Sequence, residues 1–571
     1  MKLKLKKSFS LKSSTAVRKT FLSAAIIVTG LFIFNAGLKS YESPLPEYAN
    51  SMNIPTDIIE RLRAEFGQSD LPDWAMMDPA TDGYEGTSTL KLYDYINGLN
   101  PKPEPKPLIV AVMDSGFDID HPGLKDNIWN NTAEINGQPG VDDDGNGFID
   151  DFYGWNFLGN AKDLNLELTR EYARMKKDGT PESDKYFQKV KAEFDTKQKE
   201  DQDIYDYIKM LVSQNEEAIA VLKANNITTD PKKLQEISSA LTGKSKDAAE
   251  KLLGTYMLTG LGPAEVIDAQ KEYESRISVS YNLKLDPSTI IGDDPEKLDE
   301  KGYGNNDIKP KGSTHGTHVA GIIASPTKGI GQAPFVKIMC IRVVPGQGDE
   351  RDKDVANGIR YAVDNGAKVI NLSAGKYYAK NADYVIEAIK YAESKDVLFV
   401  VAAGNEGTNI ESTVNYPPKF YRENGEIKYF PNLVCVGASS WMKTWNKEKD
   451  PSNLNRKYDL AAPFSNYSGN VVDLFAPGVE INSTVLDGKY KRLGGTSMAS
   501  PGTAGIASIL RGFFPDLTAA QVKEILVKSS RKYEGLEVKV KEARTKVLFS
   551  TLSKSGGIVD ALSAYKMATE K

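Results

Sequence analysis

Residues 108–116 read "LIVAVMDSG", a continuous run of apolar side chains that ends in an acid and a glycine. A run without polar interruptions is typical of a strand that is buried on both faces of a parallel sheet. Such a strand ends at the carboxyl edge of the sheet, where α/β proteins bind their ligands. The stretch therefore predicts a central parallel strand with Asp114 at the functional edge.

Four further apolar runs of the same kind follow along the chain. They are "VKIMCIRVV" (336–344), "AKVINLSAG" (367–375), "VLFVVAAGN" (397–405) and "LVCVGASS" (433–440). Helical patterns, with apolar residues three and four apart, lie between them at 355–366 and 383–396. Strands that alternate with helices predict an α/β fold built on a doubly wound, mostly parallel sheet.

One long segment, residues 161–285, departs from this alternation and is rich in Lys, Glu, Asp and Gln. Thr180-Pro181 and Asp230-Pro231 are expected helix starts. An intermittent helical stripe of apolar side chains runs through the segment: Phe187, Val190, Phe194, Ile204, Ile208, Leu211 and Ile219. We interpret the segment as a helical insertion whose stripe packs on the rest of the protein, with a coiled-coil dimer as the alternative.

The chain has three histidines, His121, His315 and His318. The pair in "STHGTHVAG" lacks a third metal ligand and the glutamate of a metalloprotease helix, which argues against zinc. A serine hydroxyl becomes a nucleophile when a histidine accepts its proton and a buried carboxylate orients that histidine. "AVMDSG" upstream and "GGTSMASPGTAG" downstream complete the order Asp, His, Ser. We expect His121 to be a surface or packing residue.

Four motifs in this chain order resemble those of the subtilisin-like serine endopeptidases: "VMDSG", "HGTHVAG", "AAGNEG" and "GTSMASP". The resemblance implies that Asp114 orients the histidine, His315 is the general base and acid, and Ser497 is the nucleophile. It also implies that Asn405 donates to the oxyanion together with the serine N–H. In the family the position of His318, one helical turn past His315, is structural.

The resemblance covers roughly residues 108–157 and 312–528, and "GGIVDALSAY" (556–565) matches the closing helix of the family. Two positions depart from the usual family pattern. Ala374 stands where a larger aliphatic residue is common, and Gly502-Thr503 stands where His-Val usually follows the serine motif. We expect altered subsite preferences from the first and altered helix packing from the second.

The resemblance further implies where the substrate binds. The strand "NLSAG", 371–375, resembles the edge that pairs with an extended substrate by strand addition. Together with "AAG", 402–404, it lines the pocket for the residue before the cut, and the small side chains predict a roomy pocket without a fixed charge. The expected substrate-binding residues are Ser373, Ala374, Gly375, Ala402, Ala403 and Gly404.

An acidic loop, "VDDDGNGFIDD" at 141–151, places oxygen-bearing side chains at alternate positions, as an EF-hand loop does. Its twelfth position is Tyr153, which cannot supply the carboxylate that closes an EF-hand. Because several subtilisin-like proteases hold calcium in loops, we expect a structural Ca²⁺ rather than a solvated acidic turn, and no catalytic cofactor. The expected ligands are Asp142, Asp144, Asn146, Phe148 and Asp150.

The N-terminal segment has the layout of an export signal, with basic residues before the apolar run "FLSAAIIVTGLFIF" at 21–34. The run is short for a bilayer span, which needs about 20 apolar residues. We expect cleavage after Ala36 or Gly37, with an uncleaved membrane anchor as the alternative. Either outcome exports the protein, so that it is secreted, periplasmic or on the cell surface.

Helices are expected at 55–66 and 89–98.

Composition limits the partners. The chain has 571 residues, 40% of them hydrophobic, and a net charge of −5 with both signs mixed along it. No basic run is interleaved with aromatic residues, which argues against nucleic acid. Polypeptide substrates and a monomeric state are expected. Cys340 and Cys435 lie in apolar runs and are expected to be free buried thiols rather than a disulfide.

The leading hypothesis is a secreted serine endopeptidase that acts through an acyl-enzyme. A non-catalytic, calcium-dependent binding protein on a protease fold is the alternative from a different class. A third hypothesis is an enzyme that matures one partner protein and uses the insertion as its docking surface. The expected organisation is a signal peptide or anchor at 1–37, an extension or propeptide with linker at 38–107, catalytic parts at 108–160 and 286–571, and the insertion at 161–285.

Overall fold

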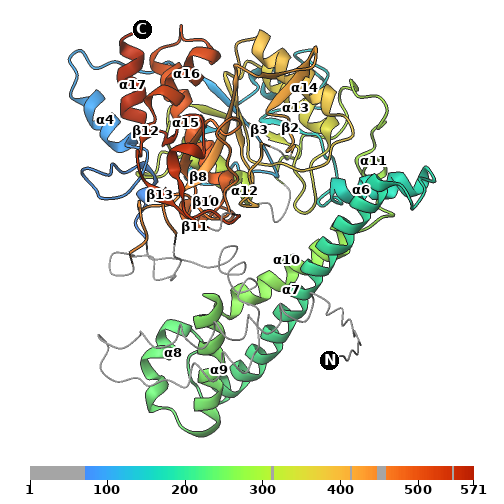
Figure 1. Ribbon diagram of the computed structural model, residues 1–571, viewed down its shortest axis with the longest axis vertical. Coiled ribbons are helices and arrows are strands. Elements are labelled where there is room, and N and C mark those ends of the chain that lie inside the picture. Colours follow the sequence, from blue (N-terminus) through green and yellow to red (C-terminus); the bar gives the residue numbers. More distant parts are fainter. Residues whose placement is uncertain (1–70, 310–313, 412–413, 447–457, 543–544) are drawn as a thin grey trace, which may run out of the picture. The chain divides into compact units, whose positions relative to one another are not determined.

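The computed structural model describes residues 71–571, except 310–313, 412–413, 447–457 and 543–544 (Figure 1). The expected export signal and the expected helix at 55–66 lie outside the described residues. The expected helix at 89–98 is confirmed as α4 (Thr89–Asn97). No helix in the described part of the chain combines the length and the apolar character that crossing a membrane requires.

A nine-stranded sheet forms the centre of the fold, in the order β12-β15-β9-β8-β5-β4-β1-β3-β2. All neighbouring strands run parallel except β12 and β15. The five strands predicted from apolar runs are β1, β3, β4, β5 and β8, and they are consecutive in this sheet, which confirms the α/β fold. The strands are β1 (Ile109–Asp114), β2 (Gly154–Asn156), β3 (Lys337–Arg342), β4 (Val369–Leu372), β5 (Leu398–Ala402), β8 (Leu433–Ser439), β9 (Leu474–Pro477), β12 (Arg531–Lys532) and β15 (Gly557–Ile558).

Helices cover both faces of the sheet because its side chains alternate between two buried cores. Val110 and Val112 of β1 belong to one core, Ala111 and Met113 to the other. Each large apolar side chain that is fully buried contributes about 1.5–3 kcal/mol. The first core includes α4, α12 (His315–Ala324), α15 (Thr496–Phe513), α16 (Ala519–Ser529) and α17 (Ala561–Thr569), and the second includes α13 (Asp352–Asp364) and α14 (Ala382–Ser394).

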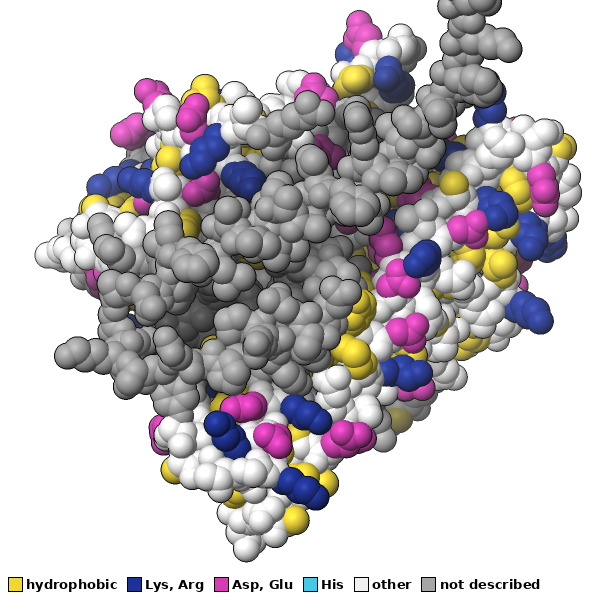
Figure 2. All heavy atoms as spheres, turned by 60° about the horizontal axis from the view of Figure 1, so that its bottom comes forward, with side chains coloured by type: hydrophobic (Ala, Val, Ile, Leu, Met, Phe, Trp, Pro, Cys, Tyr) yellow, Lys and Arg dark blue, Asp and Glu magenta, His cyan; other side chains and the backbone are white. Residues whose placement is uncertain are grey.

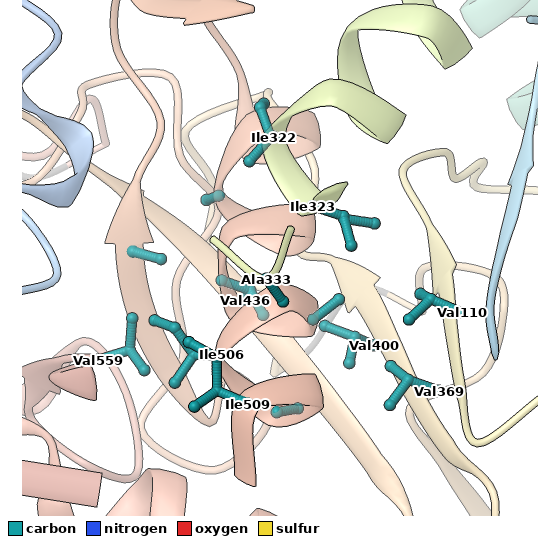
Figure 3. Close-up of a cluster of buried hydrophobic side chains, with 14 of the residues drawn as sticks. Val110, Ile322, Ile323, Ala333, Val369, Val400, Val436, Ile506, Ile509 and Val559 are labelled. Carbon is teal, nitrogen blue, oxygen red and sulfur yellow. The ribbon is translucent and has the colours of Figure 1, made fainter. Parts of the chain in front are cut away.

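Helix α15 runs through the middle of the first core. Figure 3 shows its Ile506 and Ile509 beside Val400 and Val436 of the sheet, with Ile323 of α12 nearby. Both helices are therefore anchored by buried side chains in the first core. Cys340 and Cys435 are free and buried, as predicted.

Three hairpins complete the strand set. They are β6 (Phe420–Glu423) with β7 (Glu426–Tyr429), β10 (Ile481–Val485) with β11 (Lys489–Leu493), and β13 (Glu537–Val538) with β14 (Val547–Leu548). Of these, β10 packs directly on α12.

The expected insertion is helical. It contains α6 (Glu167–Lys177), α7 (Lys185–Ala224), α8 (Pro231–Ile237), α9 (Gly243–Thr259) and α10 (Pro263–Ser280), followed by α11 (Pro287–Ile291). Helix α8 starts at Pro231 behind the N-cap Asp230, as predicted. The predicted start at Thr180-Pro181 is wrong, because the side chain of Asp184 accepts the first N–H groups of α7 and starts the helix there.

Most of the apolar stripe of α7 is buried, and its two ends pack in different clusters. Phe187, Val190 and Phe194 pack in a cluster that includes Tyr378 of the sheet-bearing part. Further along α7, Ile219 packs against a cluster of buried residues of α7, α8 and α9, within the insertion itself. The prediction that the stripe packs on the rest of the protein is therefore confirmed at Phe187, Val190 and Phe194, and it is wrong at Ile219.

Opposite charges alternate on the exposed face of α7. Lys191 lies 2.5 Å from Asp195 and Lys199 lies 2.6 Å from Asp203, in pairs four residues apart. Such exposed pairs contribute little to stability, because water and salt screen them. On the face drawn in Figure 2, Lys and Arg side chains are likewise interspersed with Asp and Glu over the coloured surface.

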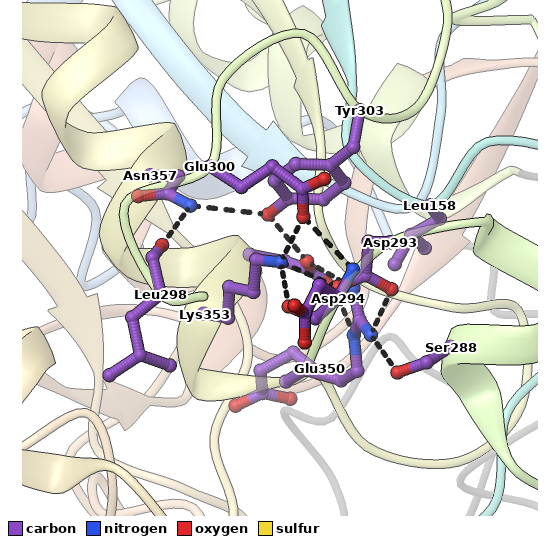
Figure 4. Close-up of polar contacts among 12 residues, drawn as sticks. Leu158, Ser288, Asp293, Asp294, Leu298, Glu300, Tyr303, Glu350, Lys353 and Asn357 are labelled. Atoms are coloured by element: carbon purple, nitrogen blue, oxygen red, sulfur yellow. Dashed lines mark hydrogen bonds and ion pairs between the residues drawn. The ribbon is translucent and has the colours of Figure 1, made fainter. Parts of the chain in front are cut away.

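The chain that returns from the insertion is anchored on the start of α13 by buried ion pairs (Figure 4). Lys353 Nζ lies 2.7 Å from both Asp293 and Glu300. Arg351 lies 2.8 Å from the other oxygen of Asp293. The ammonium group of Lys353 also lies 4.4 Å from the ring centre of Tyr303. Paired and hydrogen-bonded in this way, the buried charges hold one arrangement of the returning segment.

Candidate active site

Three neighbouring strands, β5, β4 and β1, end at the predicted site. Asp114 is the last residue of β1, Ser373 follows the end of β4, and Asn405 lies just beyond β5. Helix α12 begins at His315, and Ser497 is the second residue of α15. Parallel strands bring their carboxyl ends to one edge, so residues far apart in the sequence meet there.

The carboxylate of Asp114 holds His315 by a direct hydrogen bond. His315 Nδ1 lies 2.8 Å from Asp114 Oδ1, which also accepts the N–H of Ser115 at 2.7 Å. The side chain of Asp114 is 1% exposed and that of His315 is 37% exposed. A Cβ at Gly316 would lie 2.4 Å from the carbonyl oxygen of Gly116, so this approach of α12 to the strand end requires a glycine. With a proton on Nδ1, the imidazole keeps Nε2 as an acceptor.

The surroundings of His315 raise its pKa above the ordinary value. Burial lowers the pKa, but the negative charge of Asp114 and its hydrogen bond outweigh burial. The site therefore stabilises the protonated imidazole. A general base requires this, because it takes up a proton during the reaction.

Ser497 lies against the segment that follows β4. Its Oγ donates to the carbonyl oxygen of Ser373 at 3.1 Å, and Ser373 Oγ donates back to the carbonyl oxygen of Ser497 at 2.9 Å. In this rotamer no hydrogen bond joins Ser497 to His315, and both residues are described. Helices α12 and α15 nevertheless pack on each other. Hydrogen bonds between catalytic groups often tighten only when substrate binds, so the rotamer is compatible with a Ser-His pair.

Asn405 has an amide whose orientation is set by its neighbours. Its Oδ1 accepts the N–H of Thr496 at 2.9 Å and the hydroxyl of Thr496 at 3.0 Å. Because a backbone N–H can only donate, the amide oxygen faces Thr496, and Nδ2 has no partner in the described part of the chain. A Cβ at Gly495 would lie 3.5 Å from Asn405 Nδ2 and 3.6 Å from the nitrogen of Ser497. Two donors, one of them an unpaired N–H of the first helical turn, thus approach the same point.

The other two histidines lie against the hairpin of β10 and β11. His318 is fully buried, and its Nε2 lies 3.0 Å from the carbonyl oxygen of Ile481 and 2.9 Å from that of Lys491. Burial lowers the pKa of His318 to about 3, so the ring is neutral. His121 is also buried, with Nε2 at 2.9 Å from the carbonyl oxygen of Lys489, which identifies it as a packing residue.

Only the first two residues of the predicted substrate segment, 371–375, lie in the sheet. β4 ends at Leu372, so the prediction of a strand that reaches Gly375 is wrong. The chain is held one residue later, where Lys376 pairs with Tyr416 through N–H to O=C contacts of 3.0 and 2.8 Å. No hydrogen bond from the described residues reaches the N–H of Ala374 or Gly375. These groups are therefore available to an extended peptide.

The second predicted segment, 402–404, begins at the last residue of β5 and ends at Gly404, which has a φ of +104°. A Cβ there would lie 2.4 Å from Asn466 Nδ2 and 2.9 Å from Glu406 Oε2, so the position requires glycine. Glu406 accepts from Asn466 at 2.7 Å and from the hydroxyl of Tyr377. This carboxylate beside the predicted pocket was not predicted, although Glu406 stands directly after the motif asparagine. Of the predicted lining residues, Ala402 and Ala403 are buried, Ala374 and Gly404 are half-buried, and Ser373 is buried while Gly375 is exposed.

The acidic loop uses most of its predicted calcium ligands for its own turns. Asp142 accepts main-chain N–H groups of the loop at 3.1 and 2.8 Å. Asn146 accepts the N–H of Phe148 at 2.8 Å, and Asp150 accepts the N–H of a preceding glycine at 2.8 Å. Of the predicted ligands, Asp144 alone belongs to the group of carboxylates that the structure brings together.

That group consists of Glu134, Asp144 and Asp151, which offer oxygens within 4.8 Å of one another. Glu134 lies on the short helix α5 (Thr132–Ile135) before the loop, where no pattern marked it. Burial raises the pKa of Asp151 to about 6, although hydrogen bonds from Tyr361 and two asparagines favour its charged form. The Oδ1 of Asp150 is buried without a partner among the described residues. Carboxylate oxygens are the donors that Ca²⁺ prefers, so these residues fit a calcium ion.

A parallel α/β sheet that carries an Asp-His pair and a helix-start serine at its carboxyl edge has the architecture of a serine peptidase. The chain belongs to the subtilase family, whose profile matches residues 106–549. The match includes Asp114, His315, Asn405 and Ser497, and it spans the insertion.

Individual relatives match shorter segments. The chain is 39% identical to a thermophilic serine proteinase of Bacillus sp. (strain AK1) over 217 residues, which are 37% of this chain and 46% of the relative. It is 38% identical to thermitase of Thermoactinomyces vulgaris over 211 residues, or 36% of this chain and 64% of thermitase. With subtilisin E of Bacillus subtilis (strain 168) it shares 35% over 228 residues, or 39% of this chain and 52% of the relative. The chain thus spans between 46% and 64% of the length of these relatives.

A solved structure, of a cold adapted subtilisin-like serine proteinase, matches at 28% identity over 42% of this chain and 76% of that one. The TM-score of 0.33 is too low to support an argument about the fold.

Proposed function

We propose that the protein is an exported serine endopeptidase that cleaves peptide bonds through an acyl-enzyme. The observation that carries the proposal is the buried carboxylate of Asp114 at 2.8 Å from Nδ1 of His315, at the sheet edge where Ser497 lies in the first turn of α15. A carboxylate that fixes one imidazole nitrogen leaves the other free to accept a serine proton. Membership of the subtilase family supports the same assignment.

In the first half of the reaction, Ser497 Oγ attacks the carbonyl carbon of the scissile bond and its proton passes to His315 Nε2. Asp114 stays ionised and stabilises the imidazolium. His315 then gives the proton to the leaving nitrogen, the C–N bond breaks, and the first product departs from an ester on Ser497. In the second half, His315 takes a proton from water, the resulting hydroxide attacks the ester, and the proton returns to Ser497 Oγ as the acid product leaves.

The oxyanion of each tetrahedral intermediate is assigned to the two donors beside Gly495. Asn405 Nδ2 and the N–H of Ser497 both approach that point, and the amide of Asn405 is already oriented by Thr496. Donors that are fixed before the reaction stabilise the developing charge without reorganisation, which is usually the largest electrostatic contribution to such catalysis.

The acidic group Glu134, Asp144 and Asp151 is assigned to a structural Ca²⁺. All three residues lie on the connection between β1 and β2, and the ion would supply stability to that connection. The export part of the proposal is supported by the basic and apolar character of residues 1–37. N-terminal sequencing of the protein collected outside the cytoplasm tests the export part.

Replacement of the nucleophile tests the enzyme assignment. Ser497→Ala is expected to abolish hydrolysis of an unstructured protein such as casein, while the fold stays intact by circular dichroism. The matched control is Ser508→Ala, since Ser508 lies on the same helix and its hydroxyl bonds to the carbonyl oxygen of Ala504 at 2.8 Å. Unchanged turnover by Ser497→Ala would end the serine peptidase assignment.

A further inference from the structure

The segment that follows the predicted substrate residues is built into the base of the helical insertion. Lys376, directly after Gly375, has a side chain that is 2% exposed. Its Nζ lies 3.2 Å from Glu167 Oε2 and 2.8 Å from Asp352 Oδ1, and it donates to the carbonyl oxygen of Glu350 at 2.8 Å. Glu167 is the first residue of α6 and Asp352 the first residue of α13. One buried ammonium group therefore joins the insertion, a core helix and the substrate segment.

The ion pairs at this joint are well supported. Arg170 also binds Glu167, with Nη2 to Oε2 at 2.7 Å. Burial raises the pKa of Glu167, but the charges of Arg170 and Lys376 lower it overall, so the carboxylate is ionised at neutral pH. Buried charges that are paired and hydrogen-bonded on several sides hold one geometry, because removing one partner would leave the others uncompensated. The joint therefore fixes Lys376 relative to α6.

Two residues further along, Tyr378 enters the apolar base of the insertion. Its ring packs with Phe187 and Phe194 of α7 and with Tyr172 of α6. Its hydroxyl donates to Glu193 Oε2 on α7 at 2.7 Å. A side chain from the sheet-bearing part thus completes a small core that the insertion cannot close alone.

The position of this joint along the substrate path follows from Ser373. Ser497 Oγ contacts the carbonyl oxygen of Ser373 at 3.1 Å, so Ser373 marks the point of cleavage. An extended chain advances about 3.3 Å per residue, which places Lys376 at most about 10 Å and Tyr378 at most about 17 Å further along. A peptide paired beside 373–375 would bring residues three to five positions from the scissile bond to the base of the insertion. There, Lys197 of α7 lies 5.9 Å from the ring centre of Tyr377.

We propose that the helical insertion is a positioning element of the active site. Through Lys376 and Tyr378 it fixes the course of the segment that binds an extended substrate, and α7 flanks the path of substrate residues three to five positions from the cut. The substrate class is accordingly an extended polypeptide, long enough to reach α7. The inference rests on the proposed peptidase function, and Tyr378 and Glu193 act in it as positioning residues.

The test uses the full-length protein and two series of fluorogenic peptides that share the same residues at the cleavage site. One series is lengthened from two to eight residues on the amino-terminal side of the cut, and the other on the carboxyl-terminal side. For the wild type, kcat/KM is expected to rise once the peptide reaches four or five residues on one side. Tyr378→Phe and Glu193→Gln each remove the hydroxyl-carboxylate contact with little change of shape. Each is expected to reduce that rise about five- to tenfold, the effect of one typical hydrogen bond, through KM and not kcat.

The matched control is Tyr391→Phe, because the hydroxyl of Tyr391 donates to Asp364 at 2.6 Å between two helices remote from the substrate segment. It is expected to leave the length dependence unchanged. An equal loss on peptides of every length, no loss on any, or the same pattern in the control would overturn the inference. The peptidase assignment is judged separately in the same assay, since it requires hydrolysis by the wild type and none by Ser497→Ala.

Discussion

The sheet and the helical insertion are stabilised in different ways. The five central strands, β1, β3, β4, β5 and β8, place side chains of their two faces in two large buried cores. Asp114, Ser373 and Asn405 stand at or just beyond the ends of β1, β4 and β5. Small clusters of apolar side chains stabilise the insertion, and one of them includes Tyr378 from outside the insertion. The core is therefore expected to determine whether the chemistry occurs, and the insertion to influence which substrates reach it.

The largest effect is expected from Asp114→Asn, which alters the core site and leaves the insertion untouched. An amide cannot stabilise the imidazolium, so kcat/KM is expected to fall by about 10⁴. The carboxylate also raises the pKa of His315. A general base works when deprotonated, so activity falls as the pH drops through that pKa, and in the variant this acid limb is expected at lower pH. Steady-state rates from pH 4 to 9 measure both effects.

The control for this variant is Asp364→Asn, an exposed helix carboxylate bonded to Tyr391. Wild-type turnover is expected for it. A fall of less than about tenfold for Asp114→Asn, against the 10⁴ expected, would show that the pair is not catalytic.

Asn405→Ala is expected to reduce kcat by about 10²–10³, a range measured in subtilisin itself, which is a relative of this chain. KM is expected to change little, because the amide acts on the intermediate. Asn409→Ala is the matched control, since its exposed side chain caps a turn by accepting the N–H of Glu411 at 3.0 Å. An unchanged kcat in Asn405→Ala would remove the side chain from the oxyanion site.

Removal of calcium is expected to lower the stability of the sheet-bearing part, with no direct effect on the catalytic chemistry. At a free Ca²⁺ concentration of 100 times Kd, loss of the ion costs about 2.7 kcal/mol, which calorimetry detects as a lower Tm in a chelator. Asp144→Ala is expected to abolish the difference between calcium and chelator, whereas Asp142→Ala is expected to retain it, because Asp142 lies outside the carboxylate group. If Asp142→Ala abolished the difference and Asp144→Ala retained it, the loop would bind Ca²⁺ through the predicted EF-hand positions instead.

The smallest effect on chemistry is expected from shortening the insertion. Tyr281 binds Asp201 at 2.7 Å, so α7 and α10 adjoin there, and residues 205–277 can be replaced by a short Gly-Ser linker that keeps the base. Closure of a loop depends only weakly on its length, so the core is expected to stay folded. Hydrolysis of short peptides is expected to remain, while the rate on a folded protein changes. Parallel losses on both substrates would show that the distal helices support the fold.

Much of the core was predictable from sequence, because a buried parallel strand is a simple pattern. The apolar runs gave all five central strands, and the strand that ends at Asp114 placed the site at the correct edge. The motif residues His315 and Ser497 lie there as well. Their spacing along the chain has no meaning until parallel strands bring them to one edge.

The joints of the insertion were not predictable in the same way. Lys376 and Tyr378 belong to no motif, and nothing local distinguishes a buried ammonium group from an exposed one until its partners, far away in the chain, are placed. Glu134 was not predicted for the same reason. It lies before the acidic loop in the sequence and meets Asp144 and Asp151 only in the folded chain. At Thr180-Pro181 a local proline signal was stronger in the sequence than the aspartate cap at Asp184 that starts α7.

The central claim is that Ser497 is a nucleophile activated by the pair of Asp114 and His315, and covalent labelling tests it most directly. The native protein is incubated with a fluorophosphonate and the modified residue is identified by peptide mass spectrometry. We predict a single adduct on Ser497, formed rapidly by the wild type, far more slowly by Asp114→Asn, and not at all by Ser497→Ala. An adduct on another serine, or no adduct on a folded protein, would contradict the account.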